Sequence, residues 1–91
     1  MEIIWTKHAE DRQKQWERKL VITRQEVEDL IRNPEQIVSG DKDDLVAQRK
    51  TRDGLLRAPF IEIEGKRKIL TLYWTSKVGK YWKEEKNENK L

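Results

Sequence analysis

Apolar residues recur along the chain at two different spacings, which divide it into a helical part and a strand part. Val27, Leu30 and Ile31 follow the three- and four-residue spacing of a helix. From residue 45 onward, apolar residues fall in short runs separated by the turn pairs Asp53-Gly54 and Glu64-Gly65. Such runs are typical of strands joined by tight turns.

Two helices are predicted in the first third of the chain. Thr6 is a suitable N-cap for a helix over residues 7–19. Thr23 and Glu26 have the spacing of a capping box, in which each side chain bonds the other residue's backbone N–H. This pair predicts the start of a second helix, over residues 24–32.

The remaining segments predict strands. They are a short run over residues 2–5, an extended arm from residue 37, and strands over 45–50, 55–63 and 68–75. Pro59 has no N–H to donate, so its strand lies at a sheet edge or contains a bulge. Simple alternation along the last strand places Leu70, Leu72 and Trp74 on one face and Ile69, Thr71, Tyr73 and Thr75 on the other.

The order of these elements predicts an α+β fold. We expect an N-terminal strand and two helices packed on one face of a three- to four-stranded antiparallel meander. Residues 1–83 would form a single domain, and the charged residues 84–91 a disordered tail.

Composition excludes several classes of protein. The 91 residues include no cysteine, which rules out disulfides, thiolate metal sites and cysteine catalysis. A single histidine disfavours a zinc site, and the aspartates at 41, 43 and 44 lack the glycine and glutamate of a calcium loop. No apolar run approaches the roughly 20 residues of a membrane span, and the N-terminus does not resemble a signal peptide. We therefore expect a soluble, cytoplasmic protein that needs neither metal nor cofactor and contacts no membrane.

Charge is distributed unevenly along the chain. Residues 1–48 carry a net charge of −3, residues 49–83 carry +7 and residues 84–91 carry −1. A basic second half favours a polyanion such as nucleic acid, or an acidic protein partner. The alternative is a solvated sheet surface with few acidic residues.

His8 and Arg12 are the first candidates for chemistry. Four residues apart on a helix, they lie on one face. An imidazole can move a proton, and a guanidinium can hold the negative charge that develops in phosphodiester cleavage. The same pair could equally form an ordinary exposed helix face.

The motif H-A-x-x-R at residues 8–12, the capped helix ending near Asn33-Pro34-Glu35 and the strand I-L-T-L-Y at 69–73 together resemble a known group. They are similar to small bacterial domains of the RelE/ParE-like toxin superfamily, which is grouped with barnase, EndoU and colicin-type ribonucleases. The resemblance covers residues 3–76.

This resemblance implies a metal-independent endoribonuclease, in which the 2′-hydroxyl attacks the adjacent phosphate. It implies His8 as acid or base, Arg12 as a phosphate ligand, and Thr71 and Tyr73 as phosphate or proton-transfer groups. It suggests Lys7 and Arg49 as further basic residues that contact the nucleic acid. Some members of this fold cleave no RNA, so fold alone does not assign the activity.

Other basic residues are candidates for nucleic-acid binding. Trp82 lies between Lys80 and Lys83 and could stack on a base, and the triplet Lys66-Arg67-Lys68 could contact phosphate or form a solvated hairpin tip. The predicted partners are RNA, free or on the ribosome, or an antitoxin-like acidic protein. The alternative to the nuclease is a non-catalytic binding module that uses a basic sheet face; a second alternative is a fold with no ligand on that face.

Overall fold

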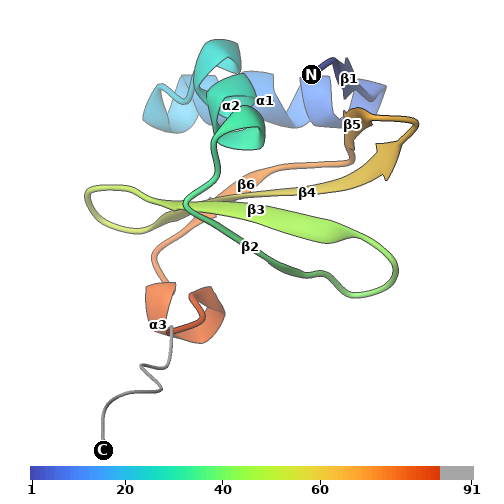
Figure 1. Ribbon diagram of the computed structural model, residues 1–91. Coiled ribbons are helices and arrows are strands. Elements are labelled where there is room, and N and C mark those ends of the chain that lie inside the picture. The colour runs from blue at the N-terminus through green and yellow to red at the C-terminus, as the bar shows by residue number, and fades with distance from the viewer. Residues whose placement is uncertain (85–91) are drawn as a thin grey trace, which may run out of the picture.

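Two helices lie over one face of a six-stranded sheet in the computed structural model (Figure 1), which describes residues 1–84. The strands are ordered β1-β5-β4-β3-β2, and β6 also pairs with β4. The α+β class is confirmed, but the sheet is mixed and not purely antiparallel, because β1 runs parallel to β5. In chain order the elements are β1 (Ile3–Trp5), α1 (Lys7–Leu20), α2 (Arg24–Arg32), β2 (Gln36–Ser39), β3 (Leu45–Lys50), β4 (Leu55–Ile63), β5 (Lys66–Ile69), β6 (Tyr73–Thr75) and α3 (Val78–Tyr81).

Both predicted helix starts are present. The Thr6 hydroxyl accepts the Ala9 N–H at 3.0 Å and itself donates to the Ile69 carbonyl of β5 at 2.8 Å. The capping box of Thr23 and Glu26 is formed in both directions. These caps satisfy backbone donors that a helix leaves free at its first turn.

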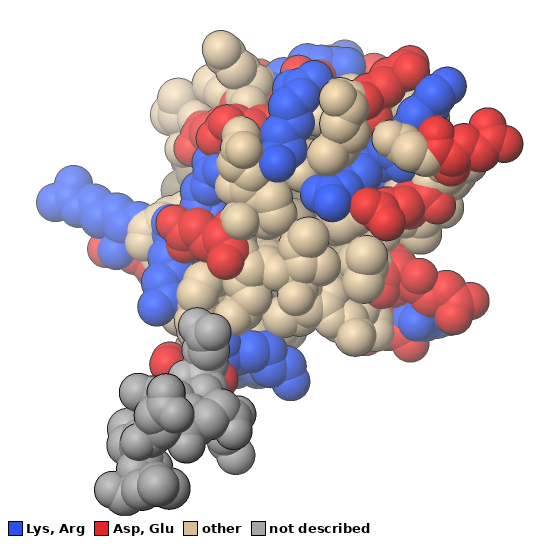
Figure 2. Space-filling view, viewed as in Figure 1, with Lys and Arg blue, Asp and Glu red and all other residues tan. Residues whose placement is uncertain are grey.

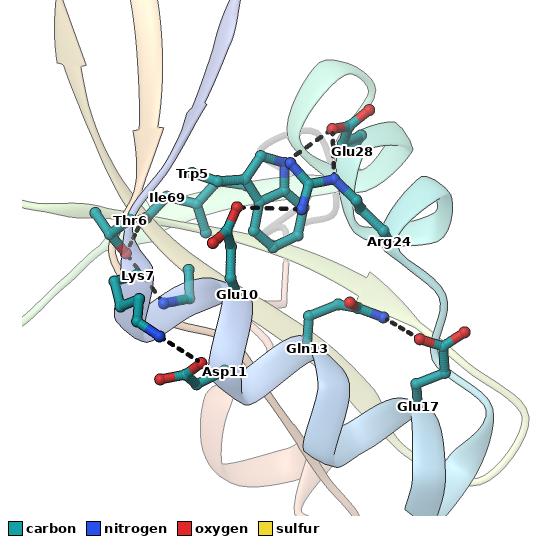
Figure 3. A network of polar contacts seen from close by, with 11 residues as sticks. Trp5, Thr6, Lys7, Glu10, Asp11, Gln13, Glu17, Arg24, Glu28 and Ile69 are labelled. Atoms are coloured by element: carbon teal, nitrogen blue, oxygen red, sulfur yellow. Dashed lines mark hydrogen bonds and ion pairs between the residues drawn. The ribbon is translucent and has the colours of Figure 1, made fainter.

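A polar network joins β1 to both helices (Figure 3). The Trp5 indole N–H donates to a Glu28 carboxylate oxygen at 2.8 Å, and the Arg24 guanidinium lies 4.2 Å from the centre of the Trp5 ring. Arg24 also pairs with Glu10 and Glu28, at 3.5 and 3.6 Å. Exposed pairs of this kind contribute little stability, so the network chiefly fixes the orientation of α1 and α2.

The core lies between the helices and one face of the sheet, called here the helix side. In β4, Leu56, Ala58 and Phe60 point toward the helices and are fully or almost fully buried. They pack with Leu30 and Ile31 of α2, among other residues. The alternating side chains of β4 point to the opposite face, called here the outer side.

A bulge in the last ribbon changes the predicted facing of its side chains. Phe60 pairs with Ile69 and Arg57 pairs with Tyr73, so three residues, 70–72, lie opposite two of β4. The extra residue interrupts the predicted strand 68–75, which becomes β5 and β6. Ile69 therefore lies in the core with residues 72 and 74, while Leu70 lines the outer side with residues 71 and 73.

Pro59 explains the position of this bulge. It lies in β4, a central strand that is itself unbroken, so the edge alternative is wrong, and the bulge lies opposite Pro59 in the neighbouring strand and not in its own. Its carbonyl accepts the Leu70 N–H at 2.9 Å, but its own nitrogen has no hydrogen to donate.

The predicted disordered tail lies outside the described residues, apart from Glu84. Within residues 1–84, no helix combines the length and apolar character required to cross a membrane.

Candidate anion-binding site

A buried arginine occupies the centre of the outer side. Arg57, in β4, is only 8% exposed, and it places a positively charged guanidinium there. Its Nε donates to Gln48 Oε1 at 2.5 Å, and an Nη donates to the Tyr73 hydroxyl. The Tyr81 ring lies against it, with the guanidinium carbon 4.1 Å from the ring centre. Three neighbouring elements, β3, β6 and α3, thus hold the guanidinium in one orientation.

All of these partners are electrically neutral. Among residues 1–84, no carboxylate lies within ion-pair distance of Arg57. A buried cation without a counter-charge is costly, because burial removes water that would otherwise solvate it. Hydrogen bonds and the Tyr81 ring offset part of that cost, and an external anion would offset more.

A cavity of about 480 Å³ opens beside the Arg57 side chain. Lys80 and Lys83 add positive charge to its wall, while Asp41 and Asp44 contribute negative charge from the β2–β3 loop. Asp44 is partly engaged, since its Oδ1 accepts the Lys42 N–H at 3.1 Å. The remaining wall includes apolar side chains of β2, β3, β4 and the bulge, namely Val38, Val46, Pro59 and Leu70.

The predicted catalytic residues are divided between two places. Thr71 and Tyr73 line the cavity beside Arg57. His8 and Arg12 lie on α1, which packs on the helix side, and neither lines the cavity. His8 is exposed, and Arg12 borders a separate hollow of about 280 Å³ beside Trp16. The structure therefore does not bring the four residues together in one cavity.

Lys80 and Trp82 lie in different surroundings. Lys80 lines the cavity, and Lys50 Nζ lies 4.5 Å from the centre of the half-buried Trp82 ring. Of the other predicted nucleic-acid ligands, Lys7 pairs with Asp11 at 3.6 Å on α1.

Two predicted nucleic-acid ligands lie on the helix side. Arg49 pairs with Asp29 at 2.9 Å and donates to the Asn33 carbonyl. Arg67 pairs with Glu62 at 3.1 Å and donates to the Ile31 carbonyl at 2.8 Å. Both guanidiniums thus donate to carbonyls in the last turn of α2 or in the residue after it. These contacts hold the helix end on the sheet.

The triplet Lys66-Arg67-Lys68 is not a hairpin tip, because it belongs to β5 and its side chains alternate between the two sides. Lys66 pairs with Glu2 at 3.5 Å, and Lys68 pairs with Ile61 in the sheet register. The triplet therefore does not act as one basic cluster.

Sequence reasoning missed the residues at the centre of this site: Arg57, Gln48 and Tyr81. One signal was available for Arg57, which interrupts the otherwise apolar run L-L-R-A-P-F. A charged residue within a buried strand needs a partner or a function. Nothing in the sequence indicated that Gln48 and Tyr81 would contact it.

Positive charge is not gathered into one patch on the face seen in Figure 2. Basic and acidic side chains are interspersed over the helices, above a largely uncharged area over β2 and β3. Within the described residues, no three His, Asp or Glu side chains are grouped to hold a metal ion.

One carboxyl group outside the site has a displaced pKa. Hydrogen bonds from Asn33 and then from Arg49, together with the positive charge of Arg49, hold the pKa of Asp29 below its ordinary value of 3.8. This group lies where α2 meets β3, on the helix side.

Comparison of the chain with protein-family models, curated proteins and solved structures finds no match. The RelE/ParE-like resemblance therefore stays a prediction from the sequence.

Proposed function

We propose that the protein binds RNA by holding a backbone phosphate against Arg57 on the outer side of the sheet. The observation that carries the proposal is that this buried guanidinium has, among residues 1–84, neutral partners and no carboxylate. Charge-assisted hydrogen bonds from arginine to phosphate are about twice as strong as neutral ones. A prepositioned guanidinium also loses little rotamer freedom when the anion arrives.

RNA fits the surroundings of Arg57 better than an acidic protein does. Lys80 and Lys83 can follow a phosphate backbone, and the Trp82 ring beside Lys50 offers a surface for a base. The cavity also presents the Thr71 and Tyr73 hydroxyls, which can bond ribose or phosphate oxygens. The two aspartates on the wall oppose phosphate and carboxylate alike, so the preference for RNA rests on the hydroxyls and on the Trp82 ring, which an acidic peptide would not need. The cytoplasm is the proposed compartment.

The sharpest test is the near-isosteric change Gln48→Glu. A carboxylate at this position would pair with Arg57 and neutralise the charge offered to phosphate. We expect binding of a fluorescein-labelled single-stranded RNA 12-mer, measured by anisotropy at low salt, to weaken by about tenfold or more, as expected from losing one charged hydrogen bond. The change also removes the hydrogen bonds that the Gln48 nitrogen donates to Gln36 and to the Tyr81 carbonyl. This loss offsets the gain from the counter-charge, so the melting temperature should stay close to that of the wild type.

Gln25→Glu is the matched control. It makes the same change in net charge at an exposed position of α2, away from the cavity. We expect it to leave RNA affinity within about twofold, since an exposed charge far from the ligand is screened by salt. Equal weakening by both variants, or none by Gln48→Glu, would contradict a site at Arg57. Binding of an acidic peptide but not RNA would assign the same site to a protein partner.

RNA cleavage is a second candidate function, favoured by the hydrogen bond between Tyr73 and Arg57. In that reaction the 2′-hydroxyl oxygen attacks phosphorus while a base takes its proton. The bond to the 5′-oxygen breaks, and that oxygen takes up a proton, giving a 2′,3′-cyclic phosphate and a 5′-hydroxyl. A phenol beside a guanidinium can exchange a proton at a position where the cation stabilises the charged phosphorane.

Cleavage is tested with single-stranded RNA in EDTA. If Tyr73 moves the proton, Tyr73→Phe should lower the rate by roughly 10²–10⁴-fold, the usual contribution of general acid–base catalysis. If the sequence-based role of His8 is right, His8→Ala should lower it by as much. Intact RNA in the presence of tight binding would leave the binding function alone.

A further inference from the structure

We infer that Gln48 and Gln36 are positioning residues that couple the docking of residues 78–83 to the orientation of Arg57. The inference rests on the proposed function, because it concerns how the same anion site is assembled. It makes the C-terminal segment part of the site and predicts that anion binding and segment docking strengthen each other.

A continuous chain of hydrogen bonds runs from the guanidinium to this segment. Gln48 accepts from Arg57 Nε with its oxygen, and with its nitrogen donates to Gln36 Oε1 at 2.8 Å and to the Tyr81 carbonyl at 3.3 Å. Gln36 in turn accepts the Lys83 N–H at 2.9 Å and donates to the Lys83 carbonyl at 2.6 Å. The Gln36 amide thus holds both backbone groups of one residue, as a neighbouring strand would.

The orientation of each amide is fixed by its partners. Gln48 must present its oxygen to Arg57, since a guanidinium only donates, and its nitrogen must then face Gln36. Gln36 must receive that nitrogen and the Lys83 N–H with its oxygen. If either amide rotated by 180°, a donor would face a donor or an acceptor would face an acceptor. The docked segment and the oriented guanidinium therefore favour the same orientation of both amides.

The segment depends on these contacts to stay on the sheet. The four-residue helix α3 has no side-chain hydrogen bond at its N-cap and contains no buried residue. Its ties to the sheet include the two glutamines, the Tyr81 ring against Arg57, and Lys50 over Trp82. An anion that fixes Arg57 would stabilise the surface on which Tyr81 packs, and by linkage the docked segment would raise anion affinity equally.

The test is Gln36→Ala in the full-length protein, read by NMR at the Arg57 Nε–H and by RNA anisotropy. Loss of the Gln36 amide should release Lys83 and loosen Gln48. Proton exchange at the Arg57 Nε–H should then become at least about fivefold faster, and RNA affinity should fall by about the same factor, the lower end of typical coupling. Ile37→Ala is the control, on the same strand but with its side chain on the helix side, and should change neither.

Wild-type protein provides a second measurement. Titration with inorganic phosphate should shift the Arg57 Nε–H and the Lys83 amide resonances with one common dissociation constant. Unchanged exchange at Arg57 in Gln36→Ala, or a Lys83 amide that ignores phosphate while Arg57 responds, would overturn the coupling. If wild-type protein binds no RNA, the proposed function fails, but the Arg57 exchange rates still decide whether the glutamines position this side chain.

Discussion

The arginines on the two sides of the sheet differ in the charge of their partners. On the helix side, Arg67 has the Glu62 carboxylate, the Ile31 carbonyl and the Phe60 ring, the last at 4.9 Å from the guanidinium carbon. On the outer side, Arg57 is more deeply buried and has an amide, a phenol and an aromatic ring. Both guanidiniums therefore have hydrogen-bond partners. Those of Arg67 include a carboxylate, whereas the partners of Arg57 named here are all neutral.

This difference separates stability from recognition. A guanidinium paired with a carboxylate has little charge left for a ligand, and Arg67 serves to bond the end of α2. A guanidinium held by neutral groups can still pair with an anion. Burying its uncompensated charge lowers the free energy of unfolding, and the apolar core on the helix side offsets that loss. Three further experiments test this division, in addition to those on the site itself.

The largest expected effect comes from the core of the helix side. Phe60 is fully buried, and Phe60→Ala should lower the free energy of unfolding by about 3–5 kcal/mol, through lost apolar burial and the cavity left behind. Urea denaturation followed by tryptophan fluorescence measures the change. Tyr73→Phe, on the outer side, keeps the ring and should cost much less. Equal losses would mean that the outer side contributes as much to stability as the core does.

A smaller effect is expected when the two kinds of basic residue in β5 are compared. Arg67→Met should destabilise by about 1–2 kcal/mol, since the Ile31 carbonyl near the end of α2 loses its donor. Lys68→Met, one residue further, should stay within about 0.5 kcal/mol, as is usual for surface positions. The same denaturation experiment applies. A loss at residue 68 equal to that at residue 67 would remove the contrast between the sides.

The smallest effect is a pH dependence on the helix side. Because the pKa of Asp29 is lowered in the folded state, its ionised form contributes stability that is fully present above the ordinary pKa of 3.8. That contribution is lost as the pH falls through the lowered pKa. Wild type and Asp29→Asn should therefore differ in unfolding free energy at neutral pH and converge in acid. The difference is small because Asp29 is exposed to solvent, and a gap that widens in acid would contradict the contact.

Elements with local signals were predicted well from the sequence. The second helix has the expected boundaries because a capping box begins it and Pro34 follows it. The strands on either side of Asp53-Gly54 match β3 and β4, because the turn pair marks where the chain reverses. In each case neighbouring residues specify the structure without help from distant ones.

Contacts between distant segments were not predictable in the same way. Simple alternation assigned Leu70 to the core, but the bulge opposite Pro59 shifted the pairing by one residue and left this side chain on the outer side. Half of the predicted catalytic set, residues 71 and 73, shares the cavity with Arg57, whereas His8 and Arg12 are carried by a helix that packs on the other side. The roles assigned to all four residues stay predictions.

The amino-acid sequence by itself determined the first two helices, their N-caps, the turns at Asp53-Gly54 and Glu64-Gly65 and the α+β class, since each depends on residues within a few positions of one another. The tertiary structure decided the parallel pairing of β1 with β5, the facing of residues 69–73 and the meeting of Arg57 with Gln48 and Tyr81. These features depend on strand register and on the requirement that buried hydrogen-bond donors and acceptors be paired. The residues that pair in this way lie on neighbouring strands but are far apart in the sequence.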